Sequence, residues 1–391
     1  MKTKVGVFFG GRSVEHEISV ISASQAINAF NKDNYTIVPV YITKNGIWYT
    51  GEALLDLEKY RDTDALLKQC EEVYMKPVYN DLNLYRKKKK IFGNDIVTEI
   101  DVALPVLHGT NGEDGVLQGL FELTGIPHAG CNLMSSANGM DKIVMKMILR
   151  ECGIPVIDYV WFTDKEWFSN KENLIDKIEQ KIGYPIIVKP ANLGSSVGIS
   201  AASDRESLIT SIEQAEKFSD RIIAEKRIVA IREINCSVLG DYSENETSVC
   251  EEPIKSGDIL SYADKYMNGG KSSKGMQSTK RQIPADLSTE ISDKIRSYAS
   301  DTFRVLSCAG VSRIDFIMDE SNNEIYVNEI NTIPGSLAFY LWEATDISFE
   351  KLMDKLIKLA FKRKREIEAK TFSYDQNIFD LSGGIKNGSK F

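Results

Sequence analysis

The sequence predicts an α/β fold in its first part and an α+β arrangement in its later parts. Strands and helices alternate through the first third of the chain, which is typical of a parallel sheet covered by helices. Long β segments and a hairpin dominate the last third. A length of 391 residues is enough for two or three domains, each with its own core. We therefore expect an N-terminal unit at 1–131, a central unit at 132–227, a C-terminal unit at 228–362 and a partly disordered tail at 363–391.

The composition favours a cytoplasmic enzyme. With 42% hydrophobic and 27% charged residues, the chain can fill a core and remain soluble. No run of about 18 apolar residues occurs, so we expect no membrane span. The net charge of −8 argues against a nucleic-acid partner. The apolar N-terminus is interrupted by Gly10 and Gly11, which makes it too short for a signal peptide. The six cysteines include no C-x-x-C pair, as expected of reduced thiols.

The N-terminal unit opens with a strand, a glycine loop and a helix. Residues 4–9 form a short apolar strand, and the apolar residues from Ile18 onward keep helical spacing. Tyr35–Ile42 is rich in β-branched residues and is predicted as a second strand. Asp101–Leu107 is apolar with little alternation, which indicates a strand buried on both faces. These strands predict a parallel sheet.

The other two units are predicted from apolar spacing and turn residues. In the central unit we expect a helix at Met140–Cys152, strands at Pro185–Lys189, Val197–Ala201 and Arg221–Glu225, and a helix at Asp204–Phe218. In the C-terminal unit we expect strands at Glu233–Leu239 and Thr247–Pro253, a helix at Ser288–Leu306, a hairpin at 313–330 and a last helix at Phe349–Phe361.

Residues 312–335 carry the most informative pattern. Arg313 and Asp315 alternate with apolar residues, so both point to one side of a strand. The length of the following turn brings Asp315 roughly opposite Glu329, with Asn331 two residues further on the same face. Two carboxylates and an amide oxygen suit Mg²⁺ beside substrate phosphates, and Arg313 could balance their charge or bind an oxyanion. An ordinary polar outer face of a hairpin explains the spacing equally well.

A second pattern joins a lysine to a loop of small residues. A predicted strand ends at Lys189 and continues into Gly194, Ser195 and Ser196. Such a loop can place backbone N–H groups around phosphate oxygens, with the lysine as a point charge. The loop is not a Walker A motif, and a plain turn between two strands is the alternative. Lys142, early in a predicted helix, is compatible with helix capping or with a phosphate contact.

Two further loops are candidates for the site. His108 lies in a glycine-punctuated loop at the carboxyl end of a buried strand, where α/β domains bind ligands. No nucleophile signature accompanies it, so a loop-bracing role is favoured over general base catalysis. Lys265 and Tyr266 precede a polar stretch at 267–283 that has no periodicity. That stretch is typical of an active-site lid and equally of a surface insertion.

Taken in order, these segments resemble the D-alanine–D-alanine ligase family of the ATP-grasp superfamily. The resemblance covers most of residues 4–335, and the joint order and spacing of its motifs are specific. The motifs are Gly10-Gly11-x-Ser13-x-Glu15-x-Glu17-x-Ser19, HGTNGEDG at 108–115, MDK at 140–142, VKPANLGSSVGIS at 188–200, DKY at 264–266, RID at 313–315 and NEINTIPG at 328–335.

The resemblance implies an ATP-grasp fold of three domains, in which the central and C-terminal domains clasp ATP. The lid would close over the γ-phosphate. The implied ribose-binding residue, Glu233, lies one position further along the chain from Glu225 than is usual in the family. The implied ATP-binding residues are Lys142, Lys189, Ser196 and Lys265 at the phosphates, Glu225 and Ile228 at the adenine, and Glu233 at the ribose.

The resemblance also implies the metal and the catalytic residues. Two Mg²⁺ ions, with Mn²⁺ as an alternative, would bridge the transferred phosphoryl group. Glu15 would orient the ammonium of the first D-amino acid in a network with Ser195 and Tyr266. The metal ligands would be Asp315, Glu329 and Asn331, the oxyanion donors Arg313 and the backbone N–H of Gly335, and the further substrate contacts His108, Tyr340 and Leu341.

The implied activity is ATP-dependent joining of two D-alanines for peptidoglycan precursors, by a protein that forms homodimers through its N-terminal domain. Tyr340 stands where the family normally has a serine that contacts the carboxylate of the acceptor amino acid. The lid also carries an apparent insertion at Gly269–Gly275. The acceptor therefore stays open among D-alanine, D-serine, D-lactate and another amine. A nucleotide-binding regulatory protein without turnover is the alternative from another class.

Overall fold

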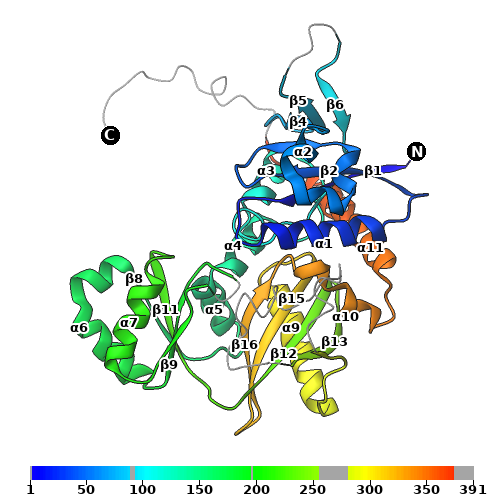
Figure 1. The fold of residues 1–391 in the computed structure, drawn as a ribbon. Coiled ribbons are helices and arrows are strands. Elements are labelled where there is room, and N and C mark those ends of the chain that lie inside the picture. The colour runs from blue at the N-terminus through cyan, green and yellow to red at the C-terminus, as the bar shows by residue number, and fades with distance from the viewer. Residues whose placement is uncertain (1, 89–92, 195–196, 255–280, 374–391) are drawn as a thin grey trace, which may run out of the picture.

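The computed structural model describes residues 2–88, 93–194, 197–254 and 281–373. Figure 1 shows the N-terminal elements, in blue and cyan, above two lower bodies that hold the central and the C-terminal elements. Each of the three bodies is built around one β-sheet, of seven, four and five strands in chain order. Within the described residues, no helix is long and apolar enough to cross a membrane.

The N-terminal sheet has the strand order β6-β5-β4-β3-β2-β1-β7. Only β2, β1 and β7 run parallel, while the strands between β2 and β6 pair antiparallel. The predicted strands are confirmed, and the difference from a purely parallel sheet comes from short strands that the sequence did not define. The elements are β1 (Thr3–Gly10), α1 (His16–Ala29), β2 (Tyr35–Ile42), β3 (Trp48–Thr50), α2 (Thr63–Leu67), β4 (Glu71–Tyr74), β5 (Asn83–Arg86), β6 (Ile96–Glu99), β7 (Val102–Pro105) and α3 (Val116–Thr124).

The central sheet is antiparallel, with the order β10-β9-β11-β8. The predicted helix over Met140–Cys152 is wrong at its start, because Asp141 has extended backbone and separates two helices. The Asp141 carboxylate accepts hydrogen bonds from the N–H groups of Ile143 and Val144 and so caps the second helix. The strand expected from Val197 begins only at Ser200. The elements are α4 (Leu133–Met140), α5 (Lys142–Glu151), β8 (Tyr159–Thr163), α6 (Asp164–Lys181), β9 (Ile186–Pro190), β10 (Ser200–Ala202), α7 (Arg205–Ala215) and β11 (Arg221–Lys226).

The C-terminal sheet is antiparallel, with the order β14-β13-β12-β15-β16. Its apolar face includes Ile234 and Ile314 and packs against Phe303 of α9. Because side chains alternate along a strand, the opposite face is left for polar residues. The elements are β12 (Ile231–Gly240), β13 (Asn245–Pro253), β14 (Arg281–Gln282), α9 (Thr289–Val305), β15 (Gly310–Asp319), β16 (Glu324–Asn331), α10 (Phe339–Glu343) and α11 (Phe349–Glu368).

The last helix extends beyond its predicted end at Phe361 and joins the N-terminal body. It runs to Glu368, and its apolar side packs in one cluster with β1 and α1. Basic residues near the C-terminal end of this helix bind to other parts of the protein. Arg363 donates to the carbonyls of Gly130 and His128 at 2.8 and 2.5 Å, and Lys362 pairs with Asp241 at 2.6 Å. The first residues of the predicted tail at 363–391 are therefore helical as far as Glu368, and residues 374–391 lie outside the described residues.

Candidate active site

Three lysines and a buried glutamate meet where the central sheet faces the C-terminal sheet. Glu225, at the end of β11, is 2% exposed and lies between Lys146 Nζ at 3.1 Å and Lys189 Nζ at 2.7 Å. Burial acts to raise the pKa of Glu225, but the charges of the two lysines overcome it and lower that pKa to about 2. Burial lowers the pKa of Lys146, against the attraction of Glu225. Two lysine side chains thus flank one buried carboxylate.

The same lysines reach the C-terminal sheet. Lys142 Nζ lies 3.4 Å from a carboxylate oxygen of Glu329 and donates to the carbonyl of Leu193 at 2.8 Å. Lys189 Nζ donates to the amide oxygen of Asn328 at 3.2 Å. Both lysines are buried. The structure thus brings the two lysines that were predicted to contact phosphates against the strand that carries a predicted metal ligand.

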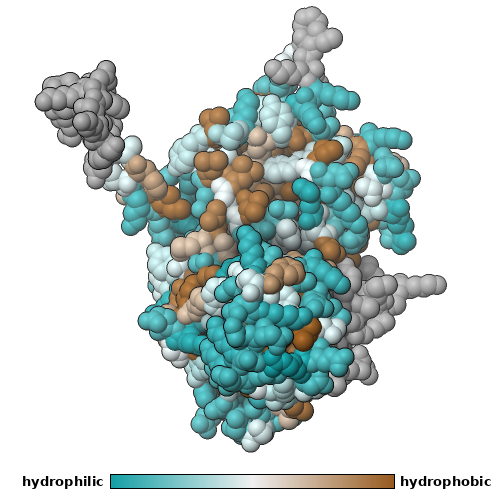
Figure 2. All heavy atoms as spheres, turned by 90° about the vertical axis from the view of Figure 1, so that its left-hand side faces the viewer, coloured by the Kyte–Doolittle hydropathy of each residue, from teal (hydrophilic) through white to brown (hydrophobic). Residues whose placement is uncertain are grey.

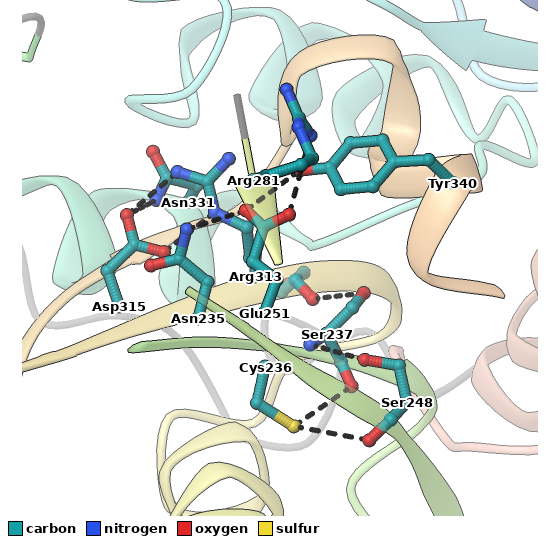
Figure 3. A network of polar contacts seen from close by, with 11 residues as sticks. Asn235, Cys236, Ser237, Ser248, Glu251, Arg281, Arg313, Asp315, Asn331 and Tyr340 are labelled. Carbon is teal, nitrogen blue, oxygen red and sulfur yellow. Dashed lines mark hydrogen bonds and ion pairs between the residues drawn. The ribbon is translucent and has the colours of Figure 1, made fainter. Parts of the chain in front are cut away.

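The register of β15 and β16 confirms the predicted grouping of acidic side chains. Asp315 stands opposite Glu329, and Asn331 stands opposite Arg313. Arg313 donates to both carboxylate oxygens of Asp315 at 2.7 Å, and the Asn331 amide donates to Asp315 at 3.0 Å. Figure 3 shows Arg313, Asp315 and Asn331 converging on one face of the sheet. Alternation on β12 and its pairing with β15 place Glu233 on this face too.

The oxygen donors of this face fit a hard divalent cation that is shared with a substrate. Among the described residues, no three His, Cys, Asp or Glu side chains gather as a complete protein-only metal site would require. Asp315 and Glu329 supply two carboxylates and Asn331 an amide oxygen. Mg²⁺ commonly binds to one or two carboxylates and completes its shell with water and phosphate oxygens. The donor set therefore fits Mg²⁺ bound together with a nucleotide.

Glu15 lies at the junction of three loops. It is 7% exposed and directly precedes α1. A Cβ added to Gly109 would lie 2.8 Å from Glu15 Oε2, and one added to Gly194 would lie 3.7 Å from the same atom. Gly109 also has a φ of +71°, so a side chain there would be both strained and in collision. Glycine at position 109 therefore allows the carboxylate of Glu15 to approach the loop that begins with His108.

A second acidic residue supports this loop. Glu113 is half-buried, and its carboxylate accepts a hydrogen bond from the Gly109 N–H at 2.8 Å and from the Ile333 N–H at 3.4 Å. Burial and the charge of Glu15 raise the pKa of Glu113 to about 8. The sequence analysis did not single out Glu113, although it is part of the HGTNGEDG segment.

His108 connects its loop to α1 and to the segment before Gly335, an arrangement in keeping with the loop-bracing role that the sequence favours over general base catalysis. Its Nδ1 lies 3.0 Å from the carbonyl of Ile333, and its Nε2 lies 2.9 Å from the hydroxyl of Ser22 on α1. The ring is 4% exposed, and burial lowers its pKa. Because both ring nitrogens are engaged with the protein, this geometry supports a positioning role.

The turn after Gly335 has an unusual backbone. Ser336, Leu337 and Ala338 have φ angles of +52°, +54° and +51°. Each left-handed non-glycine residue costs about 1–2 kcal/mol, so the surroundings must hold the turn. They do so through α1, since the Ser336 N–H donates to Ser22 Oγ at 3.1 Å and the Ser336 hydroxyl donates to Gln25 at 2.5 Å. Gly335 is thereby placed relative to the N-terminal helix.

The two predicted substrate contacts after this turn differ in exposure. The Leu341 side chain is 0% exposed and belongs to the core, so only its backbone can face a ligand. Tyr340 donates its hydroxyl to Glu251 at 3.2 Å, and the guanidinium of Arg281 lies 4.2 Å from its ring centroid. Burial and the charge of Glu251 raise the pKa of Tyr340 to about 12, so its hydroxyl stays protonated.

The remaining predicted residues lie near the cluster of buried lysines or outside the described residues. Glu225, predicted at the adenine, lies at the end of β11 beside Lys189. Ile228, predicted with it, lies in the connection from β11 to β12. The predicted residues Ser195, Ser196, Lys265 and Tyr266, and the proposed lid up to residue 280, lie outside the described residues.

Sequence reasoning missed four residues that the fold brings to this region. Lys146 follows Lys142 by four positions on one helix, and this spacing was a usable signal. Asn235, Glu251 and Arg281 come from three different strands, and no local pattern connects them. Their proximity depends on the strand order of the C-terminal sheet.

Two antiparallel sheets that face each other across buried lysines on one side and paired carboxylates on the other define the class of protein. This class is the ATP-grasp ligases, the fold that the sequence resemblance implies.

The comparisons with known proteins narrow the class to one family. Family models of the D-ala D-ala ligase N-terminus and C-terminus match residues 4–131 and 148–358. The D-alanine–D-alanine ligase of Thermosipho melanesiensis is 40% identical over 382 residues, 97% of this chain and 99% of the relative. The chain belongs to the D-alanine–D-alanine ligase family.

Solved structures agree with this assignment. The VanG D-Ala:D-Ser ligase from Enterococcus faecalis superimposes with a TM-score of 0.77 at 32% identity and covers 92% of this chain and 100% of its own. The D-alanine–D-alanine ligase from Bacillus anthracis complexed with ATP gives a TM-score of 0.65 at 25% identity, covering 93% of this chain and 99% of its own.

Proposed function

We propose that this protein phosphorylates the carboxylate of one D-alanine with ATP and couples it to the amine of a second D-alanine. The products are D-alanyl-D-alanine for peptidoglycan precursors, ADP and phosphate. The observation that carries the proposal is the contact of Lys142 and Lys189 with the strand that holds Glu329. A carboxylate is a poor acylating agent at neutral pH, and its conversion to an acyl phosphate gives it a good leaving group.

The ATP site would lie between the central and C-terminal domains. Lys142 and Lys189 would contact the phosphates, since both are buried cations that face the acidic strand. Their present partners, Glu329 and Glu225, keep them in place before ATP binds. The remaining proposed contacts are Glu225 and Ile228 at the adenine, Glu233 at the ribose, and Ser196 and Lys265 at the phosphates.

Mg²⁺ is the proposed metal, as two ions held by Asp315, Glu329 and Asn331, with Mn²⁺ as an alternative. A bound ion would neutralise the charge that develops on the transferred phosphoryl group. Arg313 donates to both carboxylate oxygens of Asp315 and the amide of Asn331 donates to one of them, so both side chains fix the orientation of this carboxylate. These side chains would position the phosphates relative to the two lysines.

The D-amino acids would bind between this face and the N-terminal domain. Glu15 would bind the ammonium of the donor, in a network with Ser195 and Tyr266. Arg313 and the N–H of Gly335 would stabilise the oxyanion that forms when the amine attacks the carbonyl. His108 would keep the two domains in register, because it links α1 to Ile333.

A second acceptor deserves a test, because Tyr340 replaces the serine expected beside the acceptor. The relative VanG is a D-Ala:D-Ser ligase and matches this fold closely. D-serine is therefore the second candidate acceptor, and D-lactate and other amines follow. Leu341 would contribute through its backbone.

The assembly and location are also proposals. Figure 2 shows hydrophobic side chains gathered over the upper, N-terminal body, while the central body below is mainly hydrophilic. Exposed apolar side chains include Val116 and Leu123 on α3 and Leu133 and Met134 on α4. We expect a cytoplasmic homodimer that uses this surface, built from domains at 1–131, 132–227 and 228–362. Light scattering on Leu123→Asp should show a monomer, and a wild-type monomer would contradict the proposal.

Incubation of the purified protein with Mg-ATP and D-alanine tests the proposed reaction. We expect ADP together with D-alanyl-D-alanine, identified by mass spectrometry. Glu329→Gln should keep the fold, judged by circular dichroism, and lose at least about a hundredfold in turnover. ADP without this dipeptide would contradict D-alanine as the acceptor. Failure to form ADP with D-alanine, alone or together with the other candidate acceptors, would contradict the enzymatic activity itself.

A further inference from the structure

A second cationic side chain shares the polar face of the C-terminal sheet with Asp315. Arg281 begins β14 and pairs with Pro253, which lies two positions along β13 from Glu251. Arg281 and Glu251 therefore point to the same face. Glu251 stands opposite Asn235, and Asn235 stands opposite Asp315 on the next strand. The strand register thus aligns Arg281 with the candidate reaction centre.

The guanidinium of Arg281 is oriented from two sides. It lies 4.2 Å from the ring centroid of Tyr340, and its Nη1 lies 3.4 Å from Glu251 Oε2. Glu251 is 3% exposed and accepts hydrogen bonds from Asn235 at 2.8 Å and from the Tyr340 hydroxyl at 3.2 Å. Figure 3 shows Arg281 above Glu251 and beside the ring of Tyr340, next to the pair formed by Arg313 and Asp315. A planar guanidinium that stacks on an aromatic ring has a fixed orientation, so its N–H donors point in a defined direction.

Arg281 and Arg313 are suited to different tasks. Arg313 donates through Nε and Nη2 to both oxygens of Asp315, which directs it to the metal side of the face. An amino-acid acceptor brings a carboxylate of its own into this region. A carboxylate that leaves water needs a charged, hydrogen-bonding partner, and the forked donors of a guanidinium match its two oxygens. Arg281 presents this group on the side of the face away from the lysines.

We propose that Arg281 binds the carboxylate of the acceptor amino acid and so selects an amino acid over an uncharged amine. Tyr340 and Glu251 are positioning residues that hold the guanidinium, and Tyr340 acts through the ring against which Arg281 packs. This inference rests on the proposed function, since it concerns the second substrate of the same reaction. It gives a physical role to the tyrosine that replaces the expected serine.

The test compares an acceptor that carries a carboxylate with one that carries an uncharged amide. D-alanine is the donor, D-alanine and D-alaninamide are the two acceptors compared, and hydroxylamine is a third nucleophile that serves as a reporter. Hydroxylamine attacks the acyl phosphate, forms the hydroxamate and releases phosphate, so it reports the donor half-reaction without an acceptor carboxylate. In Arg281→Met we expect the acceptor KM for D-alanine to rise at least about tenfold. The preference for D-alanine over D-alaninamide should disappear, while hydroxamate formation stays within about twofold.

Further variants separate a direct role from a structural one. Arg281→Lys keeps the charge and should retain part of the preference for D-alanine. Tyr340→Phe keeps the ring and should have a smaller effect on the acceptor KM than Tyr340→Leu. Arg232→Met is the matched control, because Arg232 lies on the opposite face of the sheet and pairs with Glu252. Its preference between D-alanine and D-alaninamide should equal that of the wild type.

Three outcomes would overturn the inference. An Arg281→Met variant that makes dipeptide with the wild-type acceptor preference would refute it and leave the proposed function intact. An equal fall in hydroxamate and dipeptide formation would place Arg281 on the donor or nucleotide side. A wild-type protein that forms no ADP with D-alanine would refute the proposed function, and this inference with it.

Discussion

At the scale of single residues, the site depends on charges that are buried together. Lys146 is 0% exposed, Glu225 is 2% exposed and Lys189 is buried beside them. A buried charge is tolerated when it is paired, and removal of one partner leaves the other without compensation. In the central domain, the desolvation free energy of these buried lysines is therefore offset by their pairing with Glu225.

Replacement of Lys146 tests this pairing. Lys146→Met leaves Glu225 with Lys189 as its ion-pair partner, and we expect a loss of about 3 kcal/mol in the free energy of unfolding. Lys171→Met is the control, since Lys171 and Glu213 form an exposed pair at 3.1 Å and their loss should change stability by about 0.5 kcal/mol at most. Urea unfolding measures both. Equal effects of the two substitutions would contradict the energetic role of burial.

Glu113 makes a prediction about pH. Its pKa is raised from 4.5 to about 8 in the folded protein. As pH rises from 4.5 to 8, the unfolded chain releases this proton while the folded chain retains it, so the contribution of Glu113 to stability falls. Glu113→Gln removes this titration. We expect the stability of the variant to decline less across that range in urea unfolding, and parallel curves for variant and wild type would refute the assignment.

At the scale of elements, two segments connect domains. The left-handed turn of residues 336–338 is anchored to α1 through Ser22 and Gln25. The helix α11 packs on the core of the N-terminal body, and its end binds to the carbonyls of residues 128 and 130. Both contacts fix the N-terminal domain relative to the face that carries Asp315.

Arg363 tests the docking of α11. Arg363→Ala removes two hydrogen bonds to backbone carbonyls, and we expect a loss of about 2–3 kcal/mol because the bonds involve a charged donor. The control is Arg365→Ala, an exposed residue two positions along the same helix, with an expected change within about 0.5 kcal/mol. Thermal unfolding compares the two variants. A stable Arg363→Ala would show that the apolar side of α11 alone holds the helix.

At the scale of the whole molecule, the candidate site is assembled from three domains. Glu15 comes from the N-terminal domain, Lys142 and Lys189 from the central domain, and Asp315 and Glu329 from the C-terminal domain. A ligand that binds between domains is lost when they unfold. Its binding therefore stabilises the entire fold.

Ligand-linked stability tests this assembly without measuring turnover. At one hundred times its dissociation constant, ATP with Mg²⁺ should add about 2.7 kcal/mol to the free energy of unfolding. In Glu329→Gln we expect the increment from ATP in EDTA to persist and the further increment from Mg²⁺ to disappear. Thermal unfolding with each ligand combination provides the measurement. A wild-type protein that responds to ATP but not to added Mg²⁺ would contradict the metal assignment.

The features that the sequence determined by itself are those set by short-range geometry. The pairing of Asp315 with Glu329 follows from alternation along two strands and the length of one turn, and the register confirms it. The strands at 4–9 and Tyr35–Ile42 follow from their apolar and β-branched residues. The motif order was sufficient to indicate the family.

The tertiary structure alone decided which distant side chains meet. Glu251, Arg281 and Tyr340 come from three elements, and their contact depends on the order β14-β13-β12-β15-β16 and on the position of α10. The helix α11 runs on to Glu368, and in this extension Arg363 donates to two carbonyls of the N-terminal body. Such contacts leave no local periodicity, because their energy comes from groups brought together only when the domains pack.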